Sequence, residues 1–556
     1  MRQLISLAAV GFLALSACEK GDRSTASGNS SPGGTMVISS GGEPDILFPP
    51  LMATTTSHQV TELVYDHLAD VGGSMNTFGD GDFQPALAKA WTWSPDSLSI
   101  VFHLDPTAKW HDGQPVRASD VAFTYNIYKD SATGSPTAPT LKNIDSVTAG
   151  DSATATFWFH AHTPTQFYDA AAQMLIIPAH ILKDVRGQAL RTSTLAQTPV
   201  GSGRFRFVNW KAGASLEISA DTANYRGRPK LNRVIWAFSP DPNTAFTRLV
   251  GGEADVLEQI AAPQLPQLTS HKEIRTTFVR GLDYNFICFN LRDPANHSRP
   301  HPVLGDREMR RALTMLVDRK RIVQSVYDTL AAPALGPTVR AYPTTDTTLQ
   351  QIAYSPENAA SVLDSLGWRI TGRDNVRRKG GRALEFTLTV PGSSRNRVNM
   401  AVIIQNQLAQ AGVKMNIDKL DFGPFIDREK HHAFDAILGG WHVDPSPGGV
   451  LQTWGTAGAN GGSNYGEYTS ALFDARLDSA LASPNPAERK ARFKVAYQTI
   501  IDDAPAIWLA EPKTVIAIHH RLHTTELRPD AWWSTVGEWF VPPAERIARD
   551  SAGLRQ

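Results

Sequence analysis

The sequence predicts an α/β protein with mixed sheets. Segments of helical and of strand periodicity alternate along the chain without a repeat of fixed length. Residues 385–418 show the strand, helix, strand order of a β-α-β unit. The composition, 42% hydrophobic and 19% charged, can fill several cores, and 556 residues correspond to about three or four domains at roughly 100–200 residues each.

The N-terminal half contains one predicted helix and three predicted strands. Over residues 57–69 the apolar side chains fall on one helical face. Residues 98–104, 154–159 and 234–238 are short runs rich in aliphatic and aromatic residues, which favour strands.

The C-terminal half gives sharper signals. Residues 307–330 have the apolar spacing of a single long helix. A second helix is predicted to begin with Ser355 as its cap and Pro356 at its first position, and to end at Gly367. The remaining predicted elements are a strand at 385–390, a helix at 398–411 closed by Gly412, and strands at 414–418 and 434–438.

Charge and cysteine content exclude two classes of protein. The 54 Lys and Arg balance the 54 Asp and Glu, and no basic block is present, so nucleic acid is not expected as a partner. Two cysteines cannot form a disulfide framework. Cys288 lies in an apolar run and is predicted to be a lone buried thiol.

The N-terminus resembles a bacterial lipoprotein signal. Arg2 precedes an apolar run at residues 4–15 that is too short to span a bilayer, and Leu15-Ser16-Ala17-Cys18 follows. We therefore expect a signal peptide at 1–17, lipid attachment at Cys18 and a flexible tether over 18–34. The alternative is an ordinary secretory signal. The predicted location is the periplasmic or cell-surface side of the cytoplasmic membrane, and the outer membrane is left open as the anchor's location.

A series of motifs is similar to family 5 extracellular solute-binding proteins, the dipeptide and oligopeptide receptors of ABC importers. In chain order these motifs are Phe83-Gln-Pro-Ala-Leu-Ala-Lys-Ala-Trp91, Ser94-Pro-Asp96, Phe102-His-Leu104, His111-Asp-Gly113, Ala118-Ser-Asp-Val121, Pro199-Val-Gly-Ser-Gly203, Asn224-Tyr225, Gly252-Glu-Ala-Asp255, Phe289-Asn290 and Gly440-Trp441. The resemblance extends over nearly all of the chain after the signal.

The resemblance implies a periplasmic-binding-protein-like fold of two lobes with mixed sheets and a hinge, together with a third domain. Domain I would comprise 35–75, 199–282 and 512–556, domain II 76–198, and domain III 283–511. Two crossovers, near 281–284 and 509–512, would form the hinge on which the lobes close around a ligand.

The implied function is capture of a peptide or peptide-like solute and its delivery to an ABC transporter permease. We expect a monomer with no cofactor and no catalysis, and the lipid anchor expected at Cys18 agrees with the resemblance. Motifs of hydrolases and of P-loop enzymes are absent from the sequence. The alternatives left open are an exported lipoprotein hydrolase that shares the fold, and a family member that binds a nickel complex or another non-peptide solute.

Histidine pairs give no metal site. His160 and His162, His431 and His432, and the pair in 519–523 all lack a carboxylate or cysteine partner at ligand spacing. We therefore expect no bound metal ion.

The strongest candidate for binding the ligand is Asp444. Trp441-His-Val-Asp444 matches the W-x-x-D arrangement whose aspartate holds the ligand's amino group in peptide-binding relatives. The alternative is a solvated loop aspartate that caps the turn at 445–447. The segment after Asp444 lacks the second acid that relatives often carry, which leaves the ligand class open.

Five further residues are weaker candidates for ligand binding. Arg395 and Arg397 precede a predicted helix and are expected to bind the ligand's carboxylate, with plain solvation as the alternative. Trp441 and Trp454 are expected to line a side-chain pocket, with packing as the alternative, and Glu43 is expected at the cleft rim.

Overall fold

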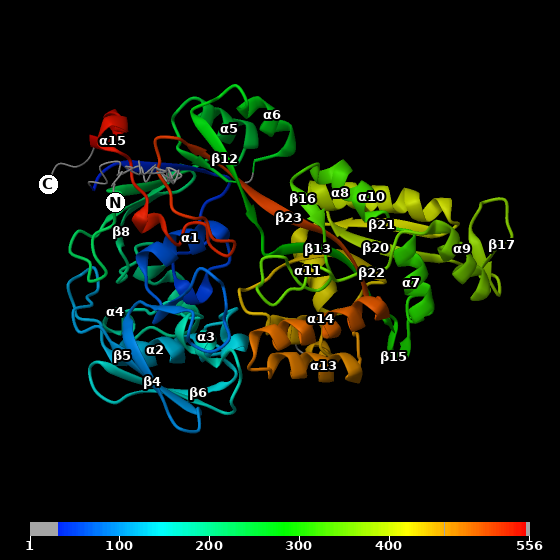
Figure 1. Ribbon diagram of the computed structural model, residues 1–556, viewed down its shortest axis with the longest axis horizontal. Coiled ribbons are helices and arrows are strands. Elements are labelled where there is room, and N and C mark those ends of the chain that lie inside the picture. The colour runs from blue at the N-terminus through cyan, green and yellow to red at the C-terminus, as the bar shows by residue number, and fades with distance from the viewer. Residues whose placement is uncertain (1–31, 259, 461, 552–556) are drawn as a thin grey trace, which may run out of the picture.

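One long strand joins two halves of the molecule. The computed structural model describes residues 32–258, 260–460 and 462–551, so the predicted signal peptide, Cys18 and most of the tether lie outside the described residues. Strand β23 (Ala506–His519) crosses from one half to the other (Figure 1). We call described residues up to 280 and from 513 the first lobe, and residues 282–512 the second lobe.

A twelve-stranded sheet among the described residues passes through both lobes, in the order β21-β20-β22-β13-β23-β11-β1-β10-β9-β8, with β12 and β16 paired to β23. Its first-lobe strands are β1 (Thr35–Ser40), β8 (Phe205–Lys211), β9 (Ser215–Ala220), β10 (Arg233–Phe238), β11 (Val256–Leu257) and β12 (Ile274–Arg280). Its second-lobe strands are β13 (Asp283–Phe289), β16 (Ala331–Pro333), β20 (Glu385–Pro391), β21 (Lys414–Leu420) and β22 (Ala436–His442). Both parallel and antiparallel pairs occur, as expected for a mixed sheet.

Strand β23 changes partner at its middle. Residues 506–512 pair with β13 and β16, and residues 513–519 pair with β12 and β11. The neighbouring chain crosses at Gly281, between β12 and β13. A Cβ atom at Gly281 would lie 2.8 Å from the carbonyl oxygen of Pro512, so the two crossing segments touch there. The predicted crossovers near 281–284 and 509–512 lie at this point, although the division into three domains stays a prediction.

A separate four-stranded antiparallel sheet belongs to the first lobe. Its order is β4 (Ala88–Trp93), β5 (Ser99–Leu104), β7 (Thr154–Phe159) and β6 (Ile144–Ala149). A short ribbon, β2 (Ala69–Val71) with β3 (Phe83–Pro85), leads into it. The first-lobe helices are α1 (Thr55–Val64), α2 (Ala118–Lys129), α3 (Gln166–Ala171), α4 (Ala179–Leu182), α5 (Pro242–Val250), α6 (Leu265–Leu268) and α15 (Ala548–Ser551).

The second lobe surrounds its part of the sheet with helices (Figure 1). These are α7 (Arg307–Met315), α8 (Arg319–Tyr327), α9 (Pro356–Ser365), α10 (Arg395–Gln410), α11 (Phe422–Lys430), α12 (Gly449–Trp454), α13 (Ala471–Leu481) and α14 (Pro486–Asp503). Two small hairpin sheets lie at its periphery: β14 (Arg292–Asp293) with β15 (Asn296–Pro300), and β17 (Arg369–Ile370), β18 (Arg377–Lys379) and β19 (Arg382–Ala383).

Short 3₁₀ turns connect several of these elements. They are η1 (Pro49–Leu51), η2 (Ala138–Leu141), η3 (Gly187–Thr192), η4 (Thr194–Ala196), η5 (Ala262–Gln264), η6 (Thr456–Ala459), η7 (Val536–Glu538) and η8 (Pro543–Glu545).

Most predicted elements are confirmed. The β-α-β unit is present, because β20 and β21 pair in parallel on either side of α10. Gly412 adopts a φ of 80° where α10 ends, a conformation that glycine tolerates without strain. Cys288 is a buried free thiol, as predicted.

One prediction about helices is wrong. The single helix expected over 307–330 is two helices, α7 and α8, because Asp318 caps a new start by accepting a hydrogen bond from the amide of Arg321. Leu316 and Val317, between the two helices, are both buried. Their apolar side chains continue the helical spacing in the sequence, so the pattern predicted one helix. Ser355 is the N-cap residue of α9 and Pro356 its first helical residue, as predicted, although the Ser355 side chain makes no capping hydrogen bond.

Candidate functional site

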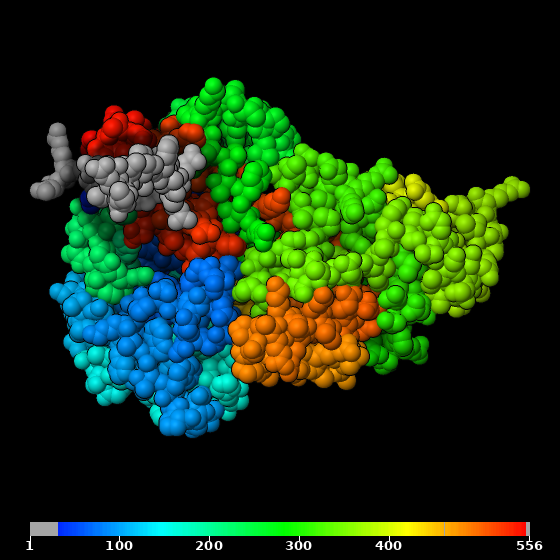
Figure 2. Space-filling view, in the orientation of Figure 1, coloured from blue at the N-terminus to red at the C-terminus, as the bar shows by residue number. Residues whose placement is uncertain are grey.

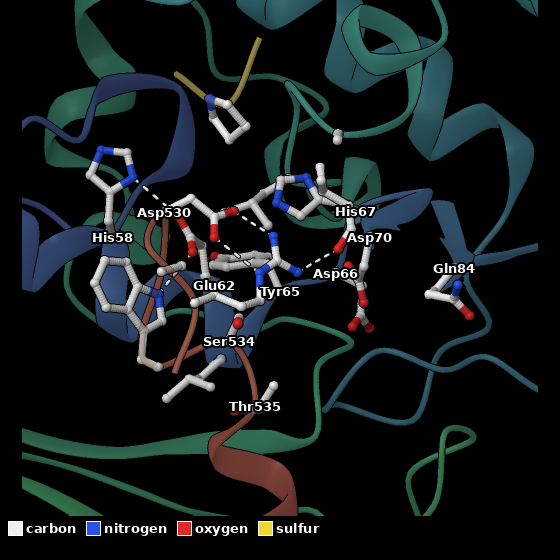
Figure 3. Close-up of a pocket in the computed structure, with 18 of the residues that line it drawn as sticks. His58, Glu62, Tyr65, Asp66, His67, Asp70, Gln84, Asp530, Ser534 and Thr535 are labelled. Carbon is white, nitrogen blue, oxygen red and sulfur yellow. Dashed lines mark hydrogen bonds and ion pairs between the residues drawn. The ribbon is translucent and has the colours of Figure 1, made fainter. Parts of the chain in front are cut away.

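A cavity of about 900 Å³ lies between the two lobes. The first lobe contributes α1, the segment after it, the end of α3 and residues 525–538, and the second lobe contributes Leu282, His442, Asp444 and Pro445. The volume lies near the upper end of the range for small-molecule sites, which is about 300–1,000 Å³. Figure 3 shows His58, Glu62 and Asp530 close together in one part of the wall.

Helix α1 places His58 and Glu62 side by side. Thr54 caps the helix by accepting a hydrogen bond from the amide of Ser57, and the four-residue spacing then puts the two side chains on one face. His58 Nδ1 lies 3.3 Å from Glu62 Oε1, and the indole of Trp533 donates to the other carboxylate oxygen at 2.8 Å. Burial opposes ionisation of Glu62, but these partners outweigh it and lower the pKa of Glu62.

The three arginines that line the cavity are all in ion pairs. Arg226 binds Asp66 at 2.9 Å and Asp70 at 2.5 Å. Arg204 binds Glu538 at 2.6 Å. Arg528 donates two hydrogen bonds to the carboxylate of Asp530, one of them from Nε at 3.0 Å. These pairs fix the wall and leave none of the three guanidinium groups without a carboxylate partner.

Asp444 is a carboxylate without a hydrogen-bond partner among the described residues. It follows β22, and the hydroxyl of Tyr342 holds its backbone by donating to the carbonyl oxygen. Its side chain remains open to solvent within the cavity. The surrounding protein nevertheless raises the pKa of Asp444 by desolvation, which the positive charges of His442 and His58 offset only in part.

Asp169 is a second carboxylate that lacks a hydrogen-bond partner among the described residues. It lies on α3, next to the lining residue Tyr168, and has no ion pair among those residues either. Burial first, and then the negative charge of Asp444, raise the pKa of Asp169 to about 8. Two carboxyl groups, one from each lobe, therefore interact unfavourably where the lobes meet.

His442 lies at the second-lobe edge of the cavity. Its Nδ1 is 3.2 Å from Asp283 Oδ1. The hydrogen bond to Asp283 outweighs burial and raises the pKa of His442, and the charges of Asp283, Asp444 and Asp530 act in the same direction. The cavity is therefore an acidic environment that stabilises positive charge.

Of the six predicted ligand-binding residues, Asp444 lines the cavity and the other five lie outside its lining. Trp441 is half-buried between the rings of Phe286 and Tyr465. Trp454 is 2% exposed and donates from its indole to the hydroxyl of Tyr284 at 3.0 Å, which favours packing over ligand contact. Glu43 is exposed and accepts hydrogen bonds from the indole of Trp210 and the amide of Gly213.

The two arginines proposed for a ligand carboxylate are at the start of α10. Arg395 is exposed. Arg397 is partly buried and donates to the side chain of Asn285 at 3.1 Å. Neither lines the cavity, so their predicted role stays a prediction.

The sequence reasoning missed most of the charged wall. Its residues come from segments far apart in the chain, so no single motif contains them. One signal was present, because Glu62, Asp66 and Asp70 recur at intervals of four residues after a predicted helix start. Asp169, Arg528 and Asp530 carried no comparable signal.

Within residues 32–258, 260–460 and 462–551, no group of three or more His, Cys, Asp or Glu side chains is arranged to hold a metal ion. Within the same residues, no helix has both the length and the apolar character required to cross a bilayer.

Comparison with known proteins adds a family and a shared fold. A model of the bacterial extracellular solute-binding proteins of family 5 matches residues 82–462. The oligopeptide-binding protein AppA of Bacillus subtilis is 25% identical over 550 residues, which cover 97% of this chain and 98% of that protein.

Two solved structures have the same fold. The structure of Bacillus subtilis AppA in complex with a nonapeptide has a TM-score of 0.77 at 23% identity, over 92% of this chain and 99% of that one. The structure of NikZ from Campylobacter jejuni in complex with Ni(L-His) has a TM-score of 0.75 at 25% identity, over 91% and 99%. The likeness shows a periplasmic-binding-protein-like fold with two lobes.

Proposed function

The chain belongs to the bacterial extracellular solute-binding proteins of family 5, and from this membership we propose that it captures a peptide or peptide-like solute between its lobes and delivers it to the permease of an ABC importer. The protein has no chemistry of its own in this proposal. The peptide-binding names of its relatives support the ligand class.

The observation that carries the proposal is the carboxylate of Asp444. It lines a cavity bounded by both lobes and has no hydrogen-bond partner among the described residues. A peptide's ammonium group supplies the missing partner, and the contact then joins a ligand in the cleft to the second lobe. In this proposal Asp169, on the first lobe, shares the same cation, which its electrostatic interaction with Asp444 supports.

Isothermal titration calorimetry with short peptides tests the proposal. We expect binding of one peptide per chain, and Asp444→Asn to weaken it by about 2–5 kcal/mol because the buried ammonium loses its charged partner. Asp184→Asn is the matched control, because Asp184 is exposed and lies outside the cavity lining. Equal affinities of wild type and Asp444→Asn would contradict the assignment of Asp444.

Incubation with a peptide mixture separates a receptor from a hydrolase. A receptor returns the bound peptide intact and in equal proportion to protein, whereas a hydrolase that shares the fold returns fragments. Native mass spectrometry of the protein as purified adds an independent measurement, because the mass of a retained solute identifies its class.

A metal chelate is the second candidate solute. The likeness to NikZ, whose structure holds Ni(L-His), favours it, and His58, His67 and His442 line the cavity. Titration with the nickel–histidine complex tests it, and the absence of binding at micromolar concentrations would leave the peptide as the candidate.

We also propose that Cys18 carries a lipid that tethers the protein outside the cytoplasmic membrane. The small residues before Cys18 and the polar segment after it support this proposal. Replacement Cys18→Ser is expected to move the protein from the membrane fraction to the soluble fraction of the cell, and an unchanged distribution would contradict the anchor.

A further inference from the structure

The cavity wall carries an excess of negative charge. Seven carboxylates and three arginines line it among the described residues, and no lysine does. The carboxylates belong to Glu62, Asp66, Asp70, Asp444, Glu526, Asp530 and Glu538.

The arginines of the cavity wall already have carboxylate partners. Each of the three arginines is in an ion pair with a carboxylate of the same wall. Three histidines, His58, His67 and His442, add charge only when protonated. A ligand carboxylate therefore finds no unpaired guanidinium or ammonium group in the described wall.

Several acids, by contrast, lack a cation. Asp444, Asp169 and Glu526 have no hydrogen bond or ion pair among the described residues. In the described part of the chain, the hydrogen-bond partners of the Glu62 carboxylate are the imidazole of His58 and the indole of Trp533. Carboxylates held near one another in a partly desolvated cleft repel, and a cationic ligand relieves that repulsion, whereas an anionic ligand adds to it.

We propose that the cleft selects solutes with two or more positive charges and does not recognise a ligand's terminal carboxylate by charge. The inference rests on the proposed function, since it names the class of solute for the same cleft. One cationic group binds at Asp444 and Asp169, and further groups bind toward Glu62 and Glu526. A terminal carboxylate stays in solvent or is bridged by water.

Calorimetry with tripeptides of different charge tests the inference. Trilysine is expected to bind at least tenfold more tightly than trialanine, triglutamate is expected not to bind, and trilysine amide is expected to bind as tightly as trilysine. The double variant Asp444→Asn/Glu526→Gln is expected to reduce the ratio between trilysine and trialanine, while Asp184→Asn leaves it unchanged.

The outcomes separate this inference from the proposed function. If trialanine binds as tightly as trilysine, or amidation weakens binding tenfold, the charge inference is wrong and the peptide receptor stands. Titration with spermidine tests charge without peptide structure, because spermidine is a polycation without a peptide backbone. Binding of spermidine but of no peptide would support the charge inference and overturn the peptide receptor, and binding of neither would overturn both.

A second observation concerns the contact between the lobes. The 72–79 loop belongs to the first lobe, but Met75 and Phe78 are buried in an apolar cluster of the second lobe. The guanidinium carbon of Arg489 lies 3.7 Å from the centroid of the Phe78 ring, and the ring of Phe493 packs edge-on against it at 6.2 Å. Figure 2 shows the corresponding blue surface of the first lobe against the orange surface of α13 and α14.

The loop is anchored at its base in the first lobe. The amide of Gly79 donates to the carbonyl oxygen of Pro164 at 2.9 Å. The next residue, Asp80, accepts hydrogen bonds from the indoles of Trp91 and Trp93 at 2.9 and 3.0 Å. Met75 at the tip has a φ of 55°, a conformation that a non-glycine side chain keeps only when its surroundings impose it.

We infer that the 72–79 loop is a latch that stabilises the closed arrangement of the lobes. When the lobes separate, Met75 and Phe78 leave an apolar site and Arg489 loses its aromatic partner. Gly72 and Gly73 at the start of the loop line the cavity, but Met75 and Phe78 do not, so a replacement of Phe78 acts on ligand affinity through closure.

Replacement Phe78→Ala tests the latch. We expect about tenfold weaker binding of trilysine, mainly through faster dissociation, and a larger radius of gyration of the bound protein by small-angle scattering. The affinity of Phe78→Leu for trilysine is expected to lie between those of wild type and Phe78→Ala. This variant keeps the test valid if the alanine variant is poorly folded. Phe422→Ala is the control, because Phe422 is 57% exposed. Unchanged dissociation rate and radius in both Phe78 variants would overturn the latch.

Discussion

Asp444 and Asp169 show how a single side chain depends on its partners. Each carboxyl group is held by its own lobe, and neither has a counter-ion among the described residues. Desolvation raises the pKa of both, and for Asp169 the charge of Asp444 adds to it. Bringing these two carboxylates together therefore costs electrostatic free energy, which the cationic ligand that we propose would offset.

The pH dependence follows from the sign of these shifts. A carboxyl group whose pKa is higher in the folded than in the unfolded protein binds more protons when folded, so the free energy of unfolding decreases as pH rises between about 4 and 8. We expect Asp169→Asn to make the ligand-free protein more stable than wild type at pH 8, by about 2 kcal/mol after allowance for solvent screening in the cleft, and nearly equal to it at pH 4. Urea unfolding of both proteins at pH 4 and pH 8 measures the difference in the free energy of unfolding.

Ligand affinity is expected to change with pH in the opposite direction. An ammonium group binds the ionised carboxylates, so trilysine should bind more tightly as pH rises from 5 to 8 and should release protons on binding. The heat of binding in buffers of different ionisation enthalpy detects the release. An affinity that falls over this range would contradict the role of the acid pair.

At the scale of elements, the end of α1 explains one glycine-rich motif. Gly203 donates its amide to the carbonyl oxygen of Val64 at 2.8 Å. A Cβ atom at Gly201 would overlap that same carbonyl, so only glycine lets the segment approach the helix end so closely. The contact fixes the direction in which the chain leaves α1, and this exit leads into the wall formed by Asp66 and Asp70.

Replacement Gly201→Ala should therefore cost about 1–3 kcal/mol in the free energy of unfolding, because backbone atoms must move to admit the methyl group. Gly423→Ala is the control, since a Cβ atom there meets nothing within 4 Å, and alanine is favoured by up to about 1 kcal/mol in a helix. Equal stability of the two variants in urea would show that the approach at Gly201 is not tight.

At the scale of the whole molecule, the two ends of the described chain are joined by a buried ion network. Arg521 binds Asp255 at 2.6 Å and Asp550 at 2.8 Å, and donates to the carbonyl oxygen of Thr35 at 2.9 Å. Asp550 in turn accepts a hydrogen bond from the amide of Thr35. The first strand, the return of the chain after β23 and the last helix are therefore tied at one point.

We expect Arg521→Met to destabilise the protein by about 3 kcal/mol, because it leaves buried carboxylates without their main cation. Arg369→Met is the control, since the Arg369 side chain is 59% exposed and its ion pair with Asp364 is worth no more than about 1 kcal/mol. Urea unfolding of the three proteins measures the difference, and a loss of less than 1 kcal/mol for Arg521→Met would contradict a structural role for the network.

The sequence by itself determined the α/β class, the β-α-β unit at 385–418, the buried thiol of Cys288 and the family, because periodicity, caps and short motifs are local properties of the chain. It also identified Asp444 as a candidate, through the four residues that end in it. Local signals could not find the break before Asp318, where buried residues imitate one continuous helical face. Nor could they show that Asp169 faces Asp444, that residues 525–538 complete the cavity, or that Phe78 packs in the opposite lobe. Those contacts join residues hundreds of positions apart, and they exist only because β23 and the chain at Gly281 bring the two lobes together.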